Sequence, residues 1–535
     1  SFGDPAHFPR FVDHGSQPTG LEKERIGKIA SKEYTLMEMT DRPNILWYCT
    51  DQQRFDTIGA LGNPHARTPG LDDLVRSGTA FTHTYCQSPI CTPSRASFMS
   101  GLYPSRVHNT RNGNESFPEW PPVITKLIAD AGYDCGMIGK FHLQSAGKRT
   151  EPRIEDGFRY WKFSHAPRDD WKEGHDYADW VRERGGDLNR LRESEDRVPT
   201  ELHQTTWASE RAIEFIRQTG KKPWLLNLNV YDPHPPFIPP KSYADQFDPS
   251  EMPGPHFEKS DLEAQAKLAD CDFQDEVRSP EEHDAKGAQA RYYAMIAQID
   301  DQFGRILQTL DETGQRDNTV IVFTSDHGDM LGERGLWYKM STLDHSMRVP
   351  LVMAGPGIVH GVSPEPCSLV DMLPTMLDWA APGAWPALGM DLDGRSLAAA
   401  AAGAETDPGA TALGVYCAEG SAHPIFMIRR GRWKYVQCDI DPPMLFDMDA
   451  DPEELQNLAA DPSYVEVDAA FAAEVRERWD SAQIRADVLA SQRMRCAVHA
   501  SMSVGRRVDW DYQPRRDASE EYVRNHMDWT VAAAT

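Results

Sequence analysis

The sequence predicts an α/β fold: a large, mostly parallel sheet flanked by helices, followed by a smaller C-terminal α+β domain. Three observations support this prediction. Short apolar runs alternate with amphipathic helical segments through most of the chain, as in parallel sheets covered on both faces. The chain has 535 residues, more than one compact core normally holds. After the linker-like tract "AAAAAGAETDPGATA" (398–412), short strand-like runs replace the alternating pattern.

The first elements can be placed in order. The run "PNILWYCTD" (43–51) is typical of a buried strand that ends on a polar residue. A helix is predicted over 68–78, where Thr and Pro mark its start and Gly its end. The segment around Cys91 leads into another helix. Three helix–strand units then follow, over 123–142, 209–234 and 291–328.

The chain therefore divides into regions that differ in composition and in hydrophobic periodicity. The stretches near 150–205 and 245–288 are rich in charged residues and weakly periodic, so we interpret them as insertions. In the C-terminal region, "IFMIRRGRWKYVQ" (425–437) and "PMLFDMDADPEELQNLAADP" (443–462) predict antiparallel strands followed by a helix. The predicted domains are an N-terminal extension (1–42), a catalytic α/β domain with the two insertions (43–398), an α+β domain (413–492) and a C-terminal tail (493–535).

Composition excludes several classes of function. The chain carries 56 Lys and Arg against 82 Asp and Glu, a formal net charge of −26. This disfavours nucleic acid or an anionic membrane as a partner, because both require basic patches. No apolar run approaches the length that spans a bilayer. The nine cysteines include no C-x-x-C pair, so neither a disulfide scaffold nor a thiolate zinc site is expected, and a cytoplasmic location is predicted.

Metal-type ligands follow two of the clearest predicted strands. Asp51-Gln52 comes after "NILWYCT", and Asp326-His327 comes after "TVIVFTS". Ligands of open α/β sheets bind at the carboxyl ends of the strands. Carboxylate and amide oxygens with one imidazole suit a hard divalent ion, calcium or manganese. Each Asp taken alone could equally cap the next turn, but converging polar groups indicate a site.

Cys91 is the second candidate centre. Pro93 suits a first helical turn, which places Cys91 near a helix N-terminus, where the dipole favours negative charge. Arg95 is four residues on and shares that helix face. For an arbitrary pair of this spacing, a buried cysteine with a surface arginine is the simpler interpretation.

The motif itself is more specific. "CTPSRASFMSGLYPSR" (91–106) resembles the Cys-x-Pro-Ser-Arg signature of type I sulfatases, of the alkaline phosphatase superfamily. The resemblance implies an alkaline phosphatase-like fold. It also implies that a formylglycine-generating enzyme oxidises Cys91 to formylglycine, whose hydrate is the nucleophile. Arg95 would then hold and polarise that group.

Further segments extend the resemblance over most of the chain. "GMIGKFHLQ" supplies Lys140 and His142, "YDPHPPFIPP" supplies His234, and "FTSDHGDMLGERGLWYKM" ends with Lys339. The implied catalytic residues are Cys91, Arg95, Lys140, His142, His234 and Lys339. The implied metal ligands are Asp51, Gln52, Cys91, Asp326 and His327. Read individually, the lysines could be surface residues and the histidines loop residues, and His83, His345 and Ser94 are interpreted as structural.

The implied activity is hydrolysis of sulfate monoesters, with the lysines and Arg95 stabilising negative charge and His142 or His234 protonating the leaving oxygen. Typical sulfatases carry Asp-Asp and Asp-Asn where this chain has Asp51-Gln52 and Asp326-His327. Both departures resemble phosphonate monoester hydrolases, whereas "DHGDMLGERGLWYKM" and "WDYQP" (510–514) resemble choline sulfatases. We therefore expect an arylsulfatase with side activity on phosphonate monoesters and phosphodiesters.

Alternative interpretations remain open at this point. The phosphonate activity could be the main one, or the substrate could be choline sulfate, whose quaternary ammonium needs an aromatic and anionic cradle. A non-catalytic metal-binding homologue is the alternative from another class. The tail, with Trp510 and Tyr512, predicts a homo-oligomer, a dimer or tetramer, in which it reaches a neighbouring subunit.

Overall fold

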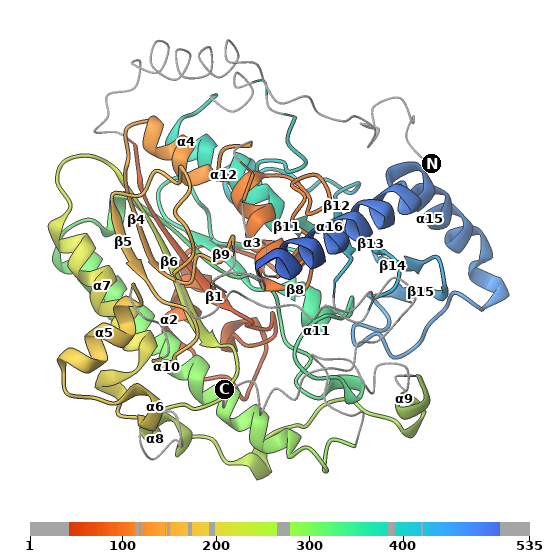
Figure 1. Cartoon of the computed structure of the whole chain (residues 1–535), viewed down its shortest axis with the longest axis horizontal. Helices are drawn as coiled ribbons and strands as arrows, with labels where there is room; N and C mark the ends of the chain where they lie inside the picture. The colour runs from red at the N-terminus through yellow and green to blue at the C-terminus, as the bar shows by residue number, and fades with distance from the viewer. Residues whose placement is uncertain are drawn as a thin grey trace.

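The computed structural model describes residues 42–502, except 113–116, 119–120, 145, 147–149, 170–173, 192–197, 265–278, 384–388, 390 and 419–420. An eight-stranded sheet forms its centre (Figure 1). Its strand order is β10 (Gly361–Ser363), β2 (Thr79–Phe81), β9 (Leu351–Ala354), β7 (Thr319–Ser325), β1 (Asn44–Asp51), β6 (Trp224–Pro233), β4 (Asp134–Gly139) and β5 (Tyr160–Phe163).

The central strands of this sheet are parallel. β1 pairs in parallel with both β6 and β7, and β4 pairs in parallel with β6 and β5. Only the pairings of β9 with β7 and with β2 are antiparallel. The carboxyl ends of β1, β7, β6 and β4 therefore lie at one edge of the sheet, which confirms the predicted mostly parallel α/β architecture.

Helices cover both faces of the sheet. Alternate residues of β1 point to opposite sides, so Trp47 joins one core cluster and Tyr48 the other. The first core packs against α3 (Cys91–Ser100), α4 (Ile124–Asp130) and α12 (Met372–Ala380). The second packs against α2 (Pro69–Ser77), α7 (Gln204–Gln218) and α10 (Ala285–Glu312). This two-sided cover explains why β1 reads as a continuous apolar run.

Short elements complete this part of the chain. A three-stranded sheet has the order β11 (Cys367–Ser368), β3 (Thr84–Tyr85) and β8 (Arg348–Val349). The remaining short helices are α5 (Asp176–Glu183), α6 (Leu188–Leu191), α8 (Lys241–Ala244), α9 (Lys259–Ala264), α11 (Asp344–Met347) and α14 (Ala398–Ala401). In the stretch near 150–205, interpreted as an insertion, β5 extends the main sheet beyond β4.

The C-terminal region is an antiparallel sheet with helices beside it (Figure 1). Its strands are β12 (Thr411–Tyr416), β13 (Ile425–Arg430), β14 (Trp433–Cys438) and β15 (Asp441–Asp447). Helix α15 (Val465–Arg478) packs Phe471 against Tyr435 of β14, and α16 (Ser481–Met502) follows. The helix expected to follow the strands begins only at Val465, because residues 448–461 form turns and extended chain.

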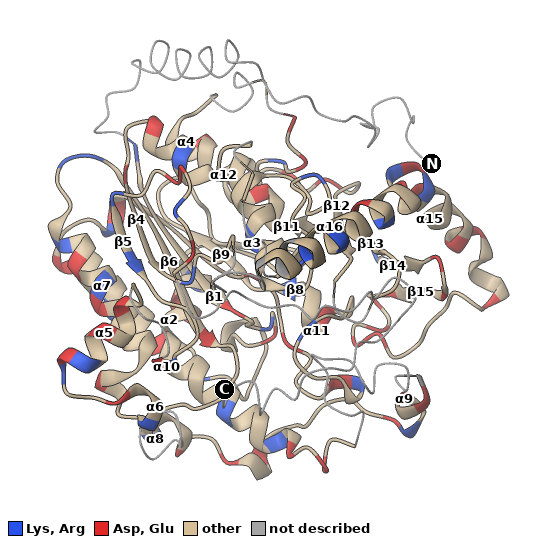
Figure 2. Cartoon of the chain, in the orientation of Figure 1, with Lys and Arg blue, Asp and Glu red and all other residues tan. Residues whose placement is uncertain are grey.

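Several outer helices carry charges of both signs. Acidic and basic positions are interspersed on α5, α7 and α15 (Figure 2). In the described part of the chain, no helix combines the length and apolarity needed to cross a membrane. Residues 1–41, Trp510 and Tyr512 lie outside the described residues, so the predicted contact between subunits stays a prediction.

Candidate active site

Four buried ligand-type side chains meet at the carboxyl edge of the sheet. Asp51 ends β1, Asp326 and His327 follow β7, and Cys91 is the first residue of α3. One ligand atom from each lies within 4.8 Å of the others. Cys91 Sγ is 3.2 Å from His327 Nε2 and 3.8 Å from Asp51 Oδ1. The structure thus brings together residues that are far apart in the sequence.

The donor atoms of this cluster fit a divalent cation. His327 Nδ1 lies 3.0 Å from the Gly328 carbonyl oxygen, which can only accept, so this nitrogen carries the proton. The Nε2 lone pair is then left facing the cluster, in the arrangement that metal-binding histidines use. Two carboxylates and an imidazole, all fully buried, are a donor set compatible with a divalent metal ion.

Arg95 is held beside the cluster by helix α3. Its Nε donates to Asp326 Oδ2 at 2.8 Å, and Nη1 donates to the Lys140 carbonyl and to Asn229 Oδ1. Its Nη2 has no hydrogen-bond partner within the described residues and lies 3.9 Å from Asp51 Oδ2. The side chain is 1% exposed, so this is a fixed, desolvated cation.

Lys140 supplies a second fixed cation from the end of β4. Its ammonium pairs with Asp51 Oδ2 and lies 5.4 Å from the centre of the Tyr231 ring. Burial opposes the charge, but Asp51 and Cys91 outweigh burial and raise the pKa of Lys140 above its ordinary value. Lys140 therefore stays protonated.

Lys339 is the third cation, and it contacts three site residues. Its Nζ donates to Gln52 Oε1 at 2.7 Å and lies 2.8 Å from His234 Nε2 and 3.4 Å from Cys91 Sγ. Gln52 was predicted among the metal ligands, and the structure places its amide between Lys339 and Asp329. The Gln52 Nε2 donates to Asp329 Oδ2 at 2.5 Å.

His234 has a defined tautomer. Its Nδ1 lies 2.8 Å from the Pro235 carbonyl oxygen, which can only accept, and 2.9 Å from the Tyr231 hydroxyl. Nδ1 therefore carries the proton, and Nε2 accepts from Lys339. Burial, followed by Lys339, lowers the pKa of His234, which favours the neutral ring.

Cys91 lies in a cationic environment. Burial alone would raise the pKa of its thiol, but Lys140 and Lys339 outweigh burial, and a hydrogen bond from His142 adds to them. The pKa is held well below its ordinary value. A group at this position is thus favoured as an anion. All six predicted catalytic residues lie around this centre.

Some contacts were not predicted from the sequence. Asn229 binds Arg95, and Asp329 binds Gln52. The signal for Asn229 was present in "LLNLNVYD", where two buried amides interrupt an apolar strand at a spacing of two and so share one face. His345 and Ser94, interpreted as structural, lie outside the ligand cluster. His345 is near Glu333, and Ser94 Oγ donates to the Asp326 carbonyl.

Models of known protein families match most of the chain. The model described as sulfatase matches residues 43–382, and that of the N-sulphoglucosamine sulphohydrolase C-terminal region matches residues 332–480. A third, choline sulfatase enzyme C terminal, matches residues 486–535. These matches together cover both the site and the C-terminal region.

Relatives with curated names are similar over long stretches. A choline-sulfatase of Rhizobium meliloti is 33% identical, covering 91% of this chain and 97% of its own. An arylsulfatase of Clostridium perfringens is 32% identical over 63% of this chain and 75% of its own. A multifunctional alkaline phosphatase superfamily protein of Trinickia caryophylli is 30% identical over 82% and 93%.

Among solved structures, a phosphonate monoester hydrolase of Agrobacterium radiobacter has a TM-score of 0.67 at 25% identity, over 83% of this chain and 96% of its own. Another phosphonate monoester hydrolase, from Silicibacter pomeroyi, has a TM-score of 0.68 at 24% identity, over 81% and 94%. The fold, the Cys91 motif and the matched family model lead to one conclusion. The chain belongs to the sulfatase family of the alkaline phosphatase superfamily.

Proposed function

We propose that this hydrolase cleaves sulfate monoesters, with aryl sulfates as its main substrates and with side activity on phosphonate monoesters and phosphodiesters. The observation that supports the proposal is the position of Cys91, which begins helix α3 within 3.4 Å of both His327 and Lys339. Once oxidised to formylglycine, residue 91 supplies one hydroxyl of its hydrate to attack sulfur, while the other allows the aldehyde to re-form as sulfate leaves.

The surrounding cations suit an anionic substrate. The nonbridging oxygens of the sulfuryl group gain charge in the transition state, and Arg95, Lys140 and Lys339 are fixed and buried near the point of attack. A divalent ion, calcium or manganese, held by Asp51, Asp326 and His327 would supply a further fixed positive charge there. Because these groups are already oriented, little reorganisation is needed during reaction.

Lys339 and His234 are the pair that protonates the leaving oxygen in this proposal. The Lys339 ammonium donates toward His234 Nε2 at 2.8 Å, while His234 Nδ1 is engaged by Pro235. Loss of a proton from Lys339 to the leaving oxygen would be balanced by a later proton from solvent, and His234 keeps the ammonium in position. His142, which hydrogen-bonds Cys91, is placed to act on the nucleophile.

The test compares esters that differ only in the transferred group. Protein coexpressed with a formylglycine-generating enzyme is assayed with p-nitrophenyl sulfate and with p-nitrophenyl phenylphosphonate, and residue 91 is examined by peptide mass. We expect the aldehyde at position 91 and a larger kcat/KM for the sulfate. A larger value for the phosphonate would reverse the assignment, and full activity with an intact Cys91 thiol would refute the mechanism.

Choline sulfate is the second candidate substrate. A choline-sulfatase of Rhizobium meliloti covers 91% of this chain, and the choline sulfatase C-terminal model matches residues 486–535. The same assay with choline sulfate tests this candidate, and turnover is measured as the sulfate released. A kcat/KM for choline sulfate above that for p-nitrophenyl sulfate would make choline sulfate the preferred substrate.

A further inference from the structure

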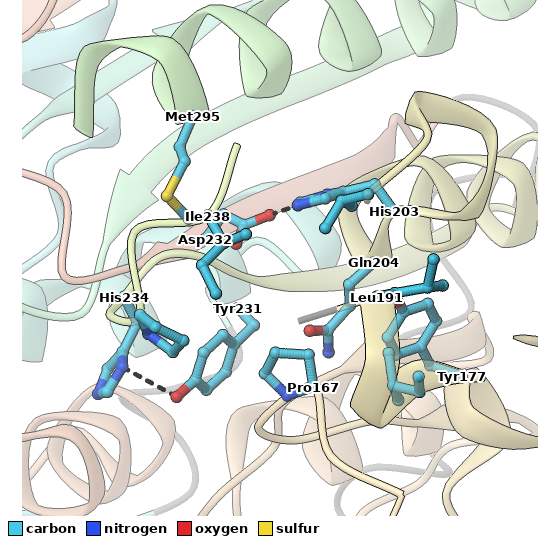
Figure 3. A pocket seen from close by; sticks show the side chains of 13 residues that line it. Pro167, Tyr177, Leu191, His203, Gln204, Tyr231, Asp232, His234, Ile238 and Met295 are labelled. Carbon is cyan, nitrogen blue, oxygen red and sulfur yellow. Dashed lines mark hydrogen bonds and ion pairs between the residues drawn. The ribbon is translucent and has the colours of Figure 1, made fainter. Parts of the chain in front are cut away.

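A cavity lies beside the active site, at the carboxyl end of strand β6 (Figure 3). Its walls come from the loop that follows β6, from α5 and α6, from the start of α7, and from α10. The enclosed space is about 420 Å³ with its mouth included, of which about 30 Å³ can hold the centre of a water-sized group. This volume suits the end of a ligand that has two or three heavy atoms, because one water needs roughly 10–15 Å³ by this measure.

The cavity adjoins the catalytic residues through Tyr231 and His234. Both side chains line it, and they contact each other through the Tyr231 hydroxyl and His234 Nδ1 (Figure 3). On their other side, His234 Nε2 meets Lys339, and the Tyr231 ring lies under the Lys140 ammonium. Tyr231 and His234 are therefore shared by the cavity and by the residues around Cys91.

Gln204 leaves an unused hydrogen-bond acceptor in this cavity. Its side chain is 3% exposed, and Nε2 donates to Ser164 Oγ and to the His165 carbonyl. Because that carbonyl can only accept, the amide orientation is fixed and Oε1 faces the other way. Oε1 has no partner among the described residues, and in Figure 3 it is on the side of Tyr231. A buried acceptor without a partner is costly, so a donor is expected there when the site is filled.

The rest of the lining is mostly apolar, and the Asp232–His203 pair is the exception. Tyr177, Leu191 and Met295 provide carbon surface, while Asp232 is 5% exposed and lies 3.5 Å from His203. Among the described residues that line the cavity, none is Lys or Arg. Asp232 therefore gives the described lining itself a negative charge, which favours a cationic group over a neutral one, while the Lys140 and Lys339 cations lie behind Tyr231 and His234.

We propose that this cavity binds the far end of the ester's organic group, and that this end carries an N–H or O–H donor for Gln204 Oε1. The inference rests on the proposed sulfate ester hydrolysis. A protonated amine binds better than a hydroxyl, because Asp232 adds charge attraction. A trimethylammonium tip carries no donor and leaves Gln204 unsatisfied, so the cavity discriminates against it.

The experiment uses three aryl sulfates whose para substituents have nearly the same shape: aminomethyl, hydroxymethyl and ethyl. Dissociation constants are measured by calorimetry in a Cys91→Ser background, so that no ester is turned over. We expect the aminomethyl ester to bind most tightly and the ethyl ester about tenfold more weakly than the hydroxymethyl ester, as one hydrogen bond would give. Equal affinities for all three would overturn the proposal and show that the cavity holds only water.

Two matched variants locate the effect. Gln204→Met removes the acceptor at similar volume and should bring the three affinities together. Gln298→Met makes the same change at a buried glutamine of α10 that does not line the cavity, and it should keep the preference. Loss of the preference in both variants would contradict a role for Gln204.

The comparison of the three esters in the Cys91→Ser background needs no change at position 204, so it decides the matter even if Gln204→Met fails to fold. Hydrolysis is measured separately in the wild-type protein. If the esters bind in the predicted order but none is cleaved, the proposed function fails and the cavity assignment stands. If all three esters are cleaved but bind with equal affinity, the proposed function stands and the cavity assignment fails.

Discussion

At the scale of single residues, the position of Lys339 depends on a short chain of hydrogen bonds. Gln52 presents its amide oxygen to Lys339, and its amide nitrogen donates to Asp329. Asp329 is 1% exposed and also accepts from the Leu331 amide. Asp329 therefore decides which end of the Gln52 amide faces Lys339. A carboxylate in place of Gln52 would face Asp329 directly, and this repulsion gives a physical reason for an amide at that position.

The first prediction is that Asp329→Asn slows turnover without an equal loss of substrate binding. The new amide group can satisfy only one of its two present donors, so Gln52 turns or loses its partner and Lys339 is displaced. We expect kcat for p-nitrophenyl sulfate to fall about tenfold or more, while KM changes less than threefold. Steady-state kinetics on metal-replete protein measures both.

Asp371→Asn serves as the control for that variant. Asp371 is also buried and accepts two backbone amides, from Ser368 and Arg395, but it lies at the start of α12. Its loss should lower stability and leave kcat within twofold. Equal effects of the two variants on kcat would show that Asp329 acts through stability alone.

The sequence was informative about residues whose position follows from the strand order. Asp51, Asp326 and His327 end adjacent parallel strands, so their meeting follows from the apolar runs and the polar residues that end them. Asp329 could not be predicted, because its contact with Gln52 depends on the path of a loop that carries no periodic signal. The cavity beside Tyr231 was also missed, since part of its wall comes from the weakly periodic stretch near 150–205.

At the scale of elements, the site depends on tight backbone paths after the strands. Gly139 ends β4 with φ of 95°, and Lys140 follows it directly. A Cβ at Gly139 would overlap the Asn229 carbonyl of the neighbouring strand β6. The left-handed backbone and the close approach both require glycine here.

The second prediction concerns that glycine. Gly139→Ala should lower the free energy of unfolding by about 2–4 kcal/mol, because it adds both backbone strain and an overlap with β6. Urea unfolding followed by tryptophan fluorescence measures it. Gly220→Ala is the matched control, since a Cβ there meets no atom within 4 Å, and it should change stability by less than about 0.5 kcal/mol. A small effect at Gly139 would contradict the packing described.

Helices and strands could be predicted where a segment was long enough to show the hydrophobic period of its element. The strand over 43–51 and the helix over 68–78 match β1 and α2 closely. The strands β2, β3, β8 and β11 span two or three residues each, too few for any period to be visible. The helix expected after the strands of the C-terminal sheet starts late, because the first helical turn begins only at Pro462, with Asp461 as its N-cap, and leads into α15.

At the scale of the whole molecule, ion pairs join distant parts of the chain. Glu333, in the loop after β7, pairs with Arg54 from the loop after β1 and with His256. His345 lies 3.7 Å from the same carboxylate. Although burial opposes ionisation, His345, His256 and Arg54 lower the pKa of Glu333 below its ordinary value of 4.5.

The third prediction follows from that lowered pKa. A depressed carboxyl pKa contributes stability that is complete above the unfolded-state value of 4.5 and is lost as the pH falls toward the folded-state value. Between pH 6 and pH 3, the free energy of unfolding should therefore fall less steeply in Glu333→Gln than in the wild type. At pH 7 the variant should be about 3 kcal/mol less stable. Parallel slopes below pH 4.5 would contradict the assignment.

A buried triad of charged residues joins the C-terminal sheet to helix α11. Lys434 of β14 donates to Asp344 of α11 at 2.7 Å and lies 2.6 Å from Glu454. All three side chains are at most 1% exposed. Lys434 bridges the two carboxylates, and Arg348 Nη1 also lies 3.4 Å from Asp344 Oδ2. The triad therefore ties the stability of the C-terminal sheet to the segment that follows Lys339.

The last prediction is that loss of the Lys434 cation destabilises the two sheets as one cooperative unit. Lys434→Met keeps the volume but leaves two buried carboxylates facing each other, so it should lower the free energy of unfolding by about 3–5 kcal/mol. The double variant with Glu454→Gln should recover part of that loss, because the repulsion is removed. Urea unfolding should show one transition, shifted as a whole, whether followed by fluorescence or by circular dichroism. A separate early transition in Lys434→Met, with the main one unchanged, would show instead that the C-terminal sheet unfolds on its own.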